Sequence, residues 1–281
     1  MLRKVLILSA SAGAGHLCAA QAIERTFLDM GAAQEVRHID VLEYMNKLFR
    51  SLHSKTYIEM VNTMPEILGW LYDYLDKPWQ NERRRLAIDK LNTRPLVKLL
   101  QQEQPDFIVC THFLPAEIIS WLKAKERIVT KQAIVVTDLN VHAMWLCHHF
   151  EHYFVALEET QVHLRQLGIP AEKITVSGIP IDPIFAEQKD KRAMRRKHGL
   201  QEDLTTILIS AGGFGVGPIE HMVQSLRDLK HSAQVVAICG RSTELKERLE
   251  QLALSHVSQQ NVSLHVVGYT TDLLRRLESA T

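Results

Sequence analysis

The sequence predicts an α/β fold built on parallel sheets. Short apolar runs alternate with helical stretches along most of the 281 residues. The runs at 106–112, 132–139, 152–157 and 173–181 are read as continuously apolar, which is typical of strands buried on both faces. Two of the apolar runs of the chain lead directly into glycine-rich turns that open helices. Strands are therefore expected at residues 5–10, 35–44, 106–112, 132–139, 152–157, 173–181, 205–211, 234–240 and 262–268.

Helices are expected between these strands. Residues 16–30 place small and apolar side chains on one face at helical spacing, and residues 45–100 form a long helical region. Further helices are expected to begin near Ile219, between the last two strands, and near Thr271.

A break in the pattern divides the chain into two domains, 1–183 and 184–281. Pro180 and Pro183 interrupt the last strand of the first part, and the charged stretch from Glu187 to Lys197 follows. The first domain then holds six expected strands and the second holds three. A length of 281 residues agrees with about two domains.

Composition excludes several classes of protein. Lys plus Arg is 33 and Asp plus Glu is 32, so no global basic excess is present to bind nucleic acid. The four cysteines form no CxxC pair, which argues against a disulfide framework or a zinc ribbon. The first apolar run is too short for a signal peptide, and no run approaches the roughly 18 residues of a spanning helix. A cytoplasmic protein, in solution or peripheral on the cytosolic face of a membrane, is expected.

The first motif, from Ser11 to His16, follows a strand and opens a helix. Gly13 and Gly15 let backbone N–H groups approach a ligand, and a helix start favours an anion. The helix dipole lowers the pKa of a histidine at this position, which suits His16 as a neutral general base. The alternative is a plain turn with an exposed histidine.

The second motif, from Thr137 to Trp145, lies just past another apolar run, and Thr111 and His112 follow a third. In open α/β sheets ligands bind beyond the carboxyl ends of the strands, so Asp138, His142 and His112 are expected to face the same crevice as His16. In the alternative interpretation, Asp138 caps a turn and His142 is a surface residue. A zinc site is disfavoured because the candidate ligands lack a short paired spacing.

The third motif, residues 210–217, places four glycines between a strand and a helix. Such a loop favours a phosphate cradle made of backbone N–H groups. It lacks the Lys-Ser/Thr pair of a Walker A loop, so an NTPase is not expected. The alternative is a flexible turn.

The fourth motif is an aromatic stretch that ends in a basic cluster. Trp and Tyr side chains followed by arginines suit a membrane interface. A core helix whose solvated end carries the arginines is an equally good interpretation. The residues proposed to contact the membrane are Trp70, Tyr72, Trp79, Arg83 and Arg84.

Together, these motifs resemble one family. SAGAGH, the 65–72 segment, THF, TDLNVHAMW, SGIPID and ISAGGFGVG occur in the order found in the monogalactosyldiacylglycerol synthase and processive diacylglycerol glucosyltransferase family, which is related to the enzyme that forms lipid II. The resemblance implies a GT-B fold, with two Rossmann-like domains for the lipid acceptor and the nucleotide-sugar donor. It implies inverting transfer of a hexose from UDP-glucose or UDP-galactose to diacylglycerol at an anionic membrane surface, without a metal or other cofactor.

The resemblance also assigns roles to individual residues. His16 matches the general base, and Asp138 matches the acidic partner that orients or polarises it. The implied acceptor-side residues are Gly13, Gly15, His112, His142 and Trp145, and the implied donor-side residues are Gly212, Gly213, Phe214 and Gly215.

The second domain is short for this family. From Gly199 on, the chain offers roughly half of the about 150 residues that a complete domain needs. We therefore expect a truncated donor domain. A non-catalytic lipid- or membrane-binding module and a nucleotide-sugar epimerase on the same fold are the alternatives.

Overall fold

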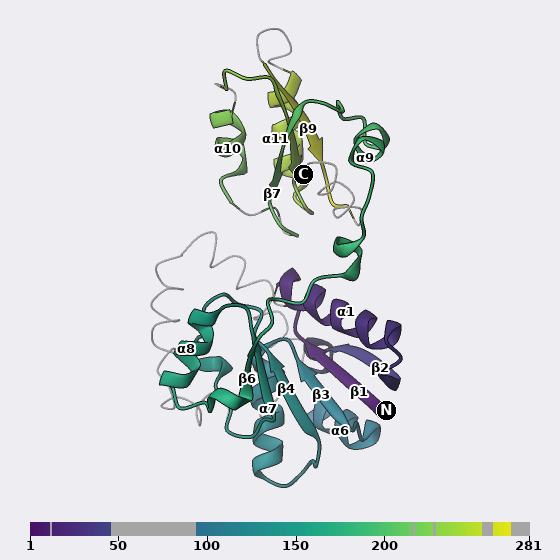
Figure 1. Cartoon of the computed structure of the whole chain (residues 1–281), viewed down its shortest axis with the longest axis vertical. Coiled ribbons are helices and arrows are strands. Elements are labelled where there is room, and N and C mark those ends of the chain that lie inside the picture. Colours follow the sequence, from purple (N-terminus) through teal and green to yellow (C-terminus); the bar gives the residue numbers. More distant parts are fainter. Residues whose placement is uncertain are drawn as a thin grey trace. The chain divides into compact units, whose positions relative to one another are not determined.

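The computed structural model describes residues 1–11, 13–45, 94–213, 215, 217–226, 229–254 and 261–270. The chain divides into two compact units, Met1–Pro183 and Ile184–Thr281. All nine expected strands are present, and every strand pairing in both sheets is parallel, which confirms the α/β class (Figure 1).

The first unit is built on a six-stranded sheet with the order β2-β1-β3-β4-β5-β6. The order reverses between β1 and β3, because β2 lies on one side of β1 and β3 lies on the other. Leu8 near the end of β1 pairs with Cys110 at the end of β3. The strands are β1 (Leu2–Ser9), β2 (Ala33–Asp40), β3 (Phe107–Cys110), β4 (Lys131–Val135), β5 (His152–Val155) and β6 (Ile174–Val176).

Helices cover both faces of this sheet. On one face, α1 (Ala14–Asp29) packs Ala20 with Ile23 and Phe27 against strand residues such as Ile7 and Val109. On the other face, α6 (Arg94–Glu103), α7 (Phe113–Ala124) and Leu164 of α8 (Glu158–Gln166) share one large core with the neighbouring strand residues. Alternate residues along each strand point to opposite faces, and in β1 and β3 residues of both faces are apolar and buried.

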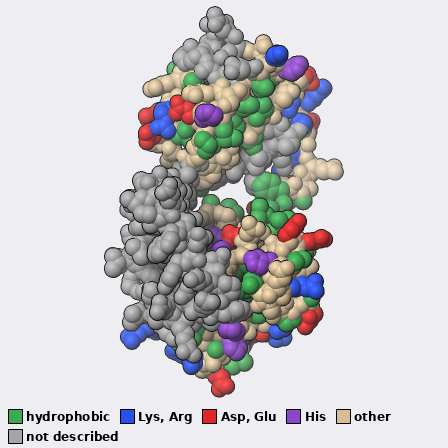
Figure 2. Space-filling view, turned by 90° about the vertical axis from the view of Figure 1, so that its left-hand side faces the viewer, with side chains coloured by type: hydrophobic (Ala, Val, Ile, Leu, Met, Phe, Trp, Pro, Cys, Tyr) green, Lys and Arg blue, Asp and Glu red, His purple; other side chains and the backbone are tan. Residues whose placement is uncertain are grey.

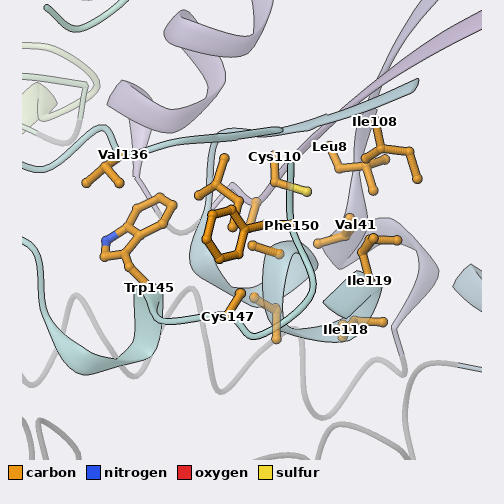
Figure 3. Packing of buried hydrophobic residues seen from close by; sticks show 14 of the residues in the cluster. Leu8, Val41, Ile108, Cys110, Ile118, Ile119, Val136, Trp145, Cys147 and Phe150 are labelled. Atoms are coloured by element: carbon orange, nitrogen blue, oxygen red, sulfur yellow. The ribbon is translucent and has the colours of Figure 1, made fainter. Parts of the chain in front are cut away.

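Part of the large core is shown in Figure 3. Leu8 and Ile108 from the strands lie with Ile118 and Ile119 of α7, and Trp145 lies in the same cluster. A short 3-10 helix, Ala143–Trp145, carries Trp145 into this core, where the residue is 0% exposed. The loop after β4 is therefore held at its far end by an aromatic anchor.

The second unit has a three-stranded sheet with the order β7-β8-β9. The strands are β7 (Thr205–Ser210), β8 (Ala233–Ile238) and β9 (Val262–Val267), with α9 (Lys191–Lys197) preceding them. One face packs against α10 (Ile219–Ser225) and α11 (Thr243–Leu254), and the other packs against Leu200, which follows α9. Both faces of β8 are buried, as its continuous apolar run predicts.

Several strands end earlier than the sequence pattern indicates. Residues 35–44 were expected to be one strand, but β2 stops at Asp40 and residues Val41–Tyr44 form a 3-10 helix. The cause is Asp40, whose carboxylate accepts hydrogen bonds from the backbone N–H of Leu42 and of Ser11, both at 3.1 Å. β6 is also short, because Gly178 with φ of +77° and Pro180 follow it.

Helix predictions are confirmed for α1, α10 and α11. Of the long helical region at 45–100, α6 is described, while residues 46–93 and the helix expected from Thr271 lie outside the described residues. No helix among the described residues is both long and apolar enough to cross a membrane. On the face seen in Figure 2, Lys and Arg are interspersed with Asp and Glu and form no large basic patch among the described residues.

Candidate functional site

The candidate site lies at the carboxyl edge of the first sheet, where the strand order reverses. Ser9 ends β1 and Cys110 ends β3, and the segments that follow carry His16 and His112. β4 ends at Val135, and the loop after it carries Thr137 and Asp138. Ligands of open α/β sheets bind at such a switch point.

His16 is held by two groups from neighbouring strand ends. Its Nδ1 lies 3.0 Å from the carbonyl oxygen of Thr111 and 2.6 Å from Oγ1 of Thr137. The Thr137 hydroxyl is in turn 3.3 Å from the same carbonyl oxygen, to which it donates. Thr111 also donates its hydroxyl to the backbone carbonyl of His16 at 3.0 Å, which fixes the first turn of α1.

The pKa of His16 is lowered. Burial is the largest cause, because it disfavours the charged imidazolium. The negative charge of Asp138 and the Thr111 carbonyl raise the pKa, and the charge of His142 lowers it. His16 is therefore favoured in its neutral form, the form that a general base needs. The sequence interpretation gave the helix dipole as the cause, whereas burial has the largest effect in the structure.

Asp138 is oriented by Trp145 and His142. The indole Nε1 of Trp145 donates to Asp138 Oδ2 at 2.7 Å, and His142 Nε2 lies 3.4 Å from the same oxygen. Burial raises the pKa of Asp138, but these hydrogen bonds and the charges of His16 and His142 outweigh it, so the pKa is lowered. Asp138 is thus an anion that acts on His16 through its charge, while the hydrogen bonds to His16 Nδ1 come from Thr111 and Thr137.

A group of aromatic rings surrounds His16. The ring of His112 meets that of His16 edge-on at a centroid distance of 4.5 Å. The ring of Phe113 is tilted against that of His112 at a centroid distance of 4.1 Å and meets the His142 ring edge-on at 5.2 Å. These contacts bring together His16, His112, Asp138, His142 and Trp145, as the sequence predicted from their places after three strands.

His112 has a structural role at the start of α7. Its Nδ1 accepts a hydrogen bond of 3.0 Å from the backbone N–H of Leu114, and the side chain is 1% exposed. Trp145 is also fully buried. The acceptor-side roles of His112, His142 and Trp145 remain predictions. The contacts show that the buried side chains of His112 and Trp145 pack against His16 and that Trp145 also holds Asp138.

Gly13 and Gly15 flank the start of α1. Gly13 is the N-cap residue with an extended backbone, φ −158° and ψ 154°. A Cβ atom at Gly15 would meet nothing within 4 Å, so the backbone there is open. Their acceptor-side role remains a prediction.

In the second unit, two loops pack backbone against backbone at the ends of β7 and β8. Gly212 and Gly215 have φ of +64° and +73°. A Cβ atom at Gly215 would lie 2.6 Å from the Cys239 carbonyl oxygen and would overlap the Ser242 side chain. A Cβ atom at Gly240 would overlap the Gly212 carbonyl oxygen. This close packing places glycines where side chains are excluded.

The loop after β7 contains the predicted donor-side residues. Arg241 N–H donates to the Gly213 carbonyl oxygen at 3.1 Å, which ties the loop after β7 to the loop after β8. The binding role of Gly212, Gly213 and Gly215 remains a prediction, and Phe214 lies outside the described residues. Sequence reasoning did not predict that Gly240 and Ser242 pack against the loop after β7. A single glycine after a strand carries little signal.

The five residues predicted to contact a membrane, Trp70, Tyr72, Trp79, Arg83 and Arg84, also lie outside the described residues. In the part of the chain that the structure describes, no group of three or more His, Cys, Asp or Glu side chains is arranged to hold a metal ion.

Two parallel-sheet units in this order define the GT-B class of fold. Solved structures share this fold over almost the whole chain. Anabaena Alr3699/HepE in complex with UDP-glucose has a TM-score of 0.53 at 14% identity, covering 99% of this chain and 72% of that chain. The S. aureus MnaA–UDP co-structure has a TM-score of 0.55 at 15% identity, covering 100% of this chain and 72% of that chain. At these identities the likeness concerns the fold alone.

Sequence comparison is more specific. The monogalactosyldiacylglycerol (MGDG) synthase family model matches residues 16–181, and the chain belongs to this family. A processive diacylglycerol beta-glucosyltransferase of Staphylococcus haemolyticus is 32% identical over 278 residues, covering 95% of this chain and 66% of that protein. The Staphylococcus epidermidis protein of the same name is 30% identical and covers 96% and 67%. The chain therefore spans about two thirds of the length of these relatives.

Proposed function

We propose that this chain transfers a hexose from a UDP-sugar to the hydroxyl of diacylglycerol. The observation that carries the proposal is His16: it is a half-buried, neutral histidine beside the anionic Asp138, at the switch point of the sheet. Membership of the family and the names of the relatives support a glycolipid product. Two structural neighbours were solved in complex with UDP-glucose and with UDP, which supports a UDP-sugar as the donor class.

In the proposed reaction, His16 accepts the hydroxyl proton of diacylglycerol. The hydroxyl oxygen forms a bond to the anomeric carbon as the bond from that carbon to the diphosphate breaks. The electron pair leaves with UDP, and the single displacement inverts the anomeric centre. An alcohol is a weak nucleophile, so a base within hydrogen-bond reach accelerates this step. The negative charge of Asp138 stabilises the imidazolium that His16 becomes.

The donor is assigned to the loop of Gly212, Gly213 and Gly215. Backbone N–H groups of a glycine loop are suited to stabilise the charge that develops on a leaving diphosphate, which supports this assignment. The proposed step uses no metal and no cofactor besides the UDP-sugar.

The acceptor lies in a membrane, so the proposed place of action is the membrane surface. UDP-sugars are cytosolic, which assigns the protein to the cytosolic face as a peripheral protein. An anionic lipid surface as partner, held by the predicted contact residues Trp70 and Arg83, belongs to the same proposal.

Transfer by the purified chain tests the proposal. Labelled UDP-glucose and UDP-galactose are each incubated with mixed vesicles of diacylglycerol and anionic phospholipid, and the lipid product is extracted. We expect labelled glycosyl-diacylglycerol, with UDP-glucose as the better donor, because the relatives are named as glucosyltransferases.

Matched variants locate the base. His16→Gln is expected to lower the rate at least 100-fold. His149→Gln is the control, since His149 is exposed and precedes β5, at the opposite edge of the sheet. Wild-type rates in His16→Gln would remove the base assignment. Vesicle binding without any transfer by the wild-type chain would overturn the enzyme proposal in favour of a lipid-binding module.

A further inference from the structure

We propose that Thr137 is a positioning residue for neutral His16: the proton of the ring lies on Nδ1, set there by the Thr111 carbonyl, the Thr137 hydroxyl is the second group that holds this Nδ1–H, and the Nε2 lone pair is the basic site. The inference rests on the proposed function for its catalytic meaning. Its structural content concerns three groups from three segments: the imidazole of α1, the carbonyl that follows β3, and the hydroxyl that follows β4.

The tautomer follows from what each neighbour of Nδ1 is able to do. The carbonyl oxygen of Thr111, at 3.0 Å, has no proton and only accepts. An unprotonated Nδ1 would place its lone pair against the lone pairs of that oxygen, which is repulsive. A protonated Nδ1 donates to the carbonyl and shares its proton with Thr137 Oγ1 at 2.6 Å. The Nδ1–H tautomer is therefore favoured.

The Thr137 hydroxyl completes this arrangement. With its oxygen accepting from Nδ1–H, its own proton is directed to the Thr111 carbonyl, 3.3 Å away. The three groups form a closed triangle in which every proton has an acceptor. Two anchors on one ring nitrogen also restrict rotation of the imidazole, as the partner of a catalytic histidine does elsewhere.

Asp138 does not fill this role. Its Oδ2 accepts from Trp145 Nε1 and lies next to His142, so the partners of this carboxylate oxygen come from its own loop rather than from His16 Nδ1. Neutral oxygens at Nδ1 stabilise an imidazolium less than a hydrogen-bonded carboxylate would. This arrangement holds the ring in place while keeping the histidine neutral before the acceptor arrives.

The tautomer can be read directly without substrate. The whole chain is labelled with 15N-histidine, and the nitrogen shifts and long-range proton couplings of His16 are assigned by their loss in His16→Gln. We expect a protonated Nδ1 and an unprotonated Nε2 in the wild-type chain above the pKa of the ring. A protonated Nε2 in neutral His16 would overturn the inference. Because this readout needs no turnover, it stands apart from failure of the proposed reaction.

Three variants test the role of the hydroxyl. Thr137→Val keeps the shape and removes Oγ1, so we expect kcat to fall about tenfold with little change in KM. Thr137→Ser restores the hydroxyl and is expected to restore kcat to within about threefold. Thr111→Val removes the hydroxyl bond to the His16 carbonyl but keeps the backbone carbonyl at Nδ1, so it is expected to preserve the tautomer.

The pH profile separates positioning from a general structural loss. The titratable groups around His16 in the described part of the chain are Asp138, His142 and His112. All are retained in Thr137→Val. Loss of an acceptor at Nδ1–H destabilises the imidazolium, so the acid limb of kcat/KM is expected to move to lower pH. Equal activity and an unmoved acid limb in folded Thr137→Val would overturn the positioning role.

Discussion

The indole Nε1 of Trp145 donates a 2.7 Å hydrogen bond to Oδ2 of Asp138 and thereby joins the hydrophobic core to the polar site. The Trp145 ring is 0% exposed, and Asp138 is half-buried at the sheet edge. Asp138, whose charge acts on His16, is thus oriented by the core residue Trp145. Packing of the loop from 136 to 145 and electrostatics at His16 are coupled through this one bond.

Replacing Trp145 by Phe tests this coupling. The variant loses buried volume and one hydrogen bond to a carboxylate, so we expect the free energy of unfolding to fall by about 2–4 kcal/mol. The pKa of Asp138 is expected to rise, because a donor that stabilises the carboxylate is gone. Urea denaturation and a carboxyl 13C titration measure the two effects. Phe150→Leu is the control: it also loosens the core, but it should leave the Asp138 pKa in place.

Stability is expected to depend on pH through His16 and His38. Burial is the largest cause of the lowered pKa of both residues. The unfolded chain therefore binds protons more readily than the folded chain does. Stability is full above the unfolded pKa of about 6.5 and falls as the pH drops from there through the folded values. Urea midpoints between pH 8 and pH 5 measure this slope. His16→Gln and His38→Gln should each flatten it, and an unchanged slope in the double variant would contradict this origin.

Two glycines near the donor-side loop should differ sharply in their tolerance of alanine. Gly240 has φ of +58°, and its Cβ atom would overlap the Gly212 carbonyl oxygen and lie 3.0 Å from the Gly213 carbonyl carbon. Gly212 has φ of +64°, but its Cβ atom would meet nothing within 4 Å. We expect Gly212→Ala to cost about 1 kcal/mol from backbone strain alone, and Gly240→Ala to cost at least about 3 kcal/mol. Thermal unfolding of both variants measures the difference, and equal costs would argue against backbone contact between the loops.

Cysteine reactivity should follow burial. Cys18 is exposed, while Cys110, Cys147 and Cys239 are buried and none forms a disulfide. Burial raises the pKa of Cys110 to about 12, so its reactive thiolate is negligible at neutral pH. We expect a maleimide to modify Cys18 alone in the native protein and all four cysteines after unfolding, as counted by mass spectrometry. Cys18→Ser should abolish native labelling. Rapid native modification of Cys110 would show that the core opens more readily than its packing implies.

Strands that are buried on both faces, such as β8, were predicted correctly from apolar runs, because such strands need apolar residues at most positions. The ends of the strands were not predicted correctly. β2 stops at Asp40 because its carboxylate caps the backbone of Leu42 and Ser11, and the second of these contacts joins residues 29 apart. Local sequence indicates a cap, but it does not indicate which distant N–H the cap binds.

The sequence by itself determined the nine strands, the family, and the gathering of His16, His112 and Asp138 at one edge. Parallel strands place their carboxyl ends together, so residues that follow them meet. Only the tertiary structure decided that Thr137, 121 residues from His16, holds its Nδ1, and that Asp138 pairs with Trp145. These choices depend on strand register, loop path and side-chain rotamers. A shift of one residue or one rotamer redirects a hydrogen bond while leaving the apolar pattern unchanged.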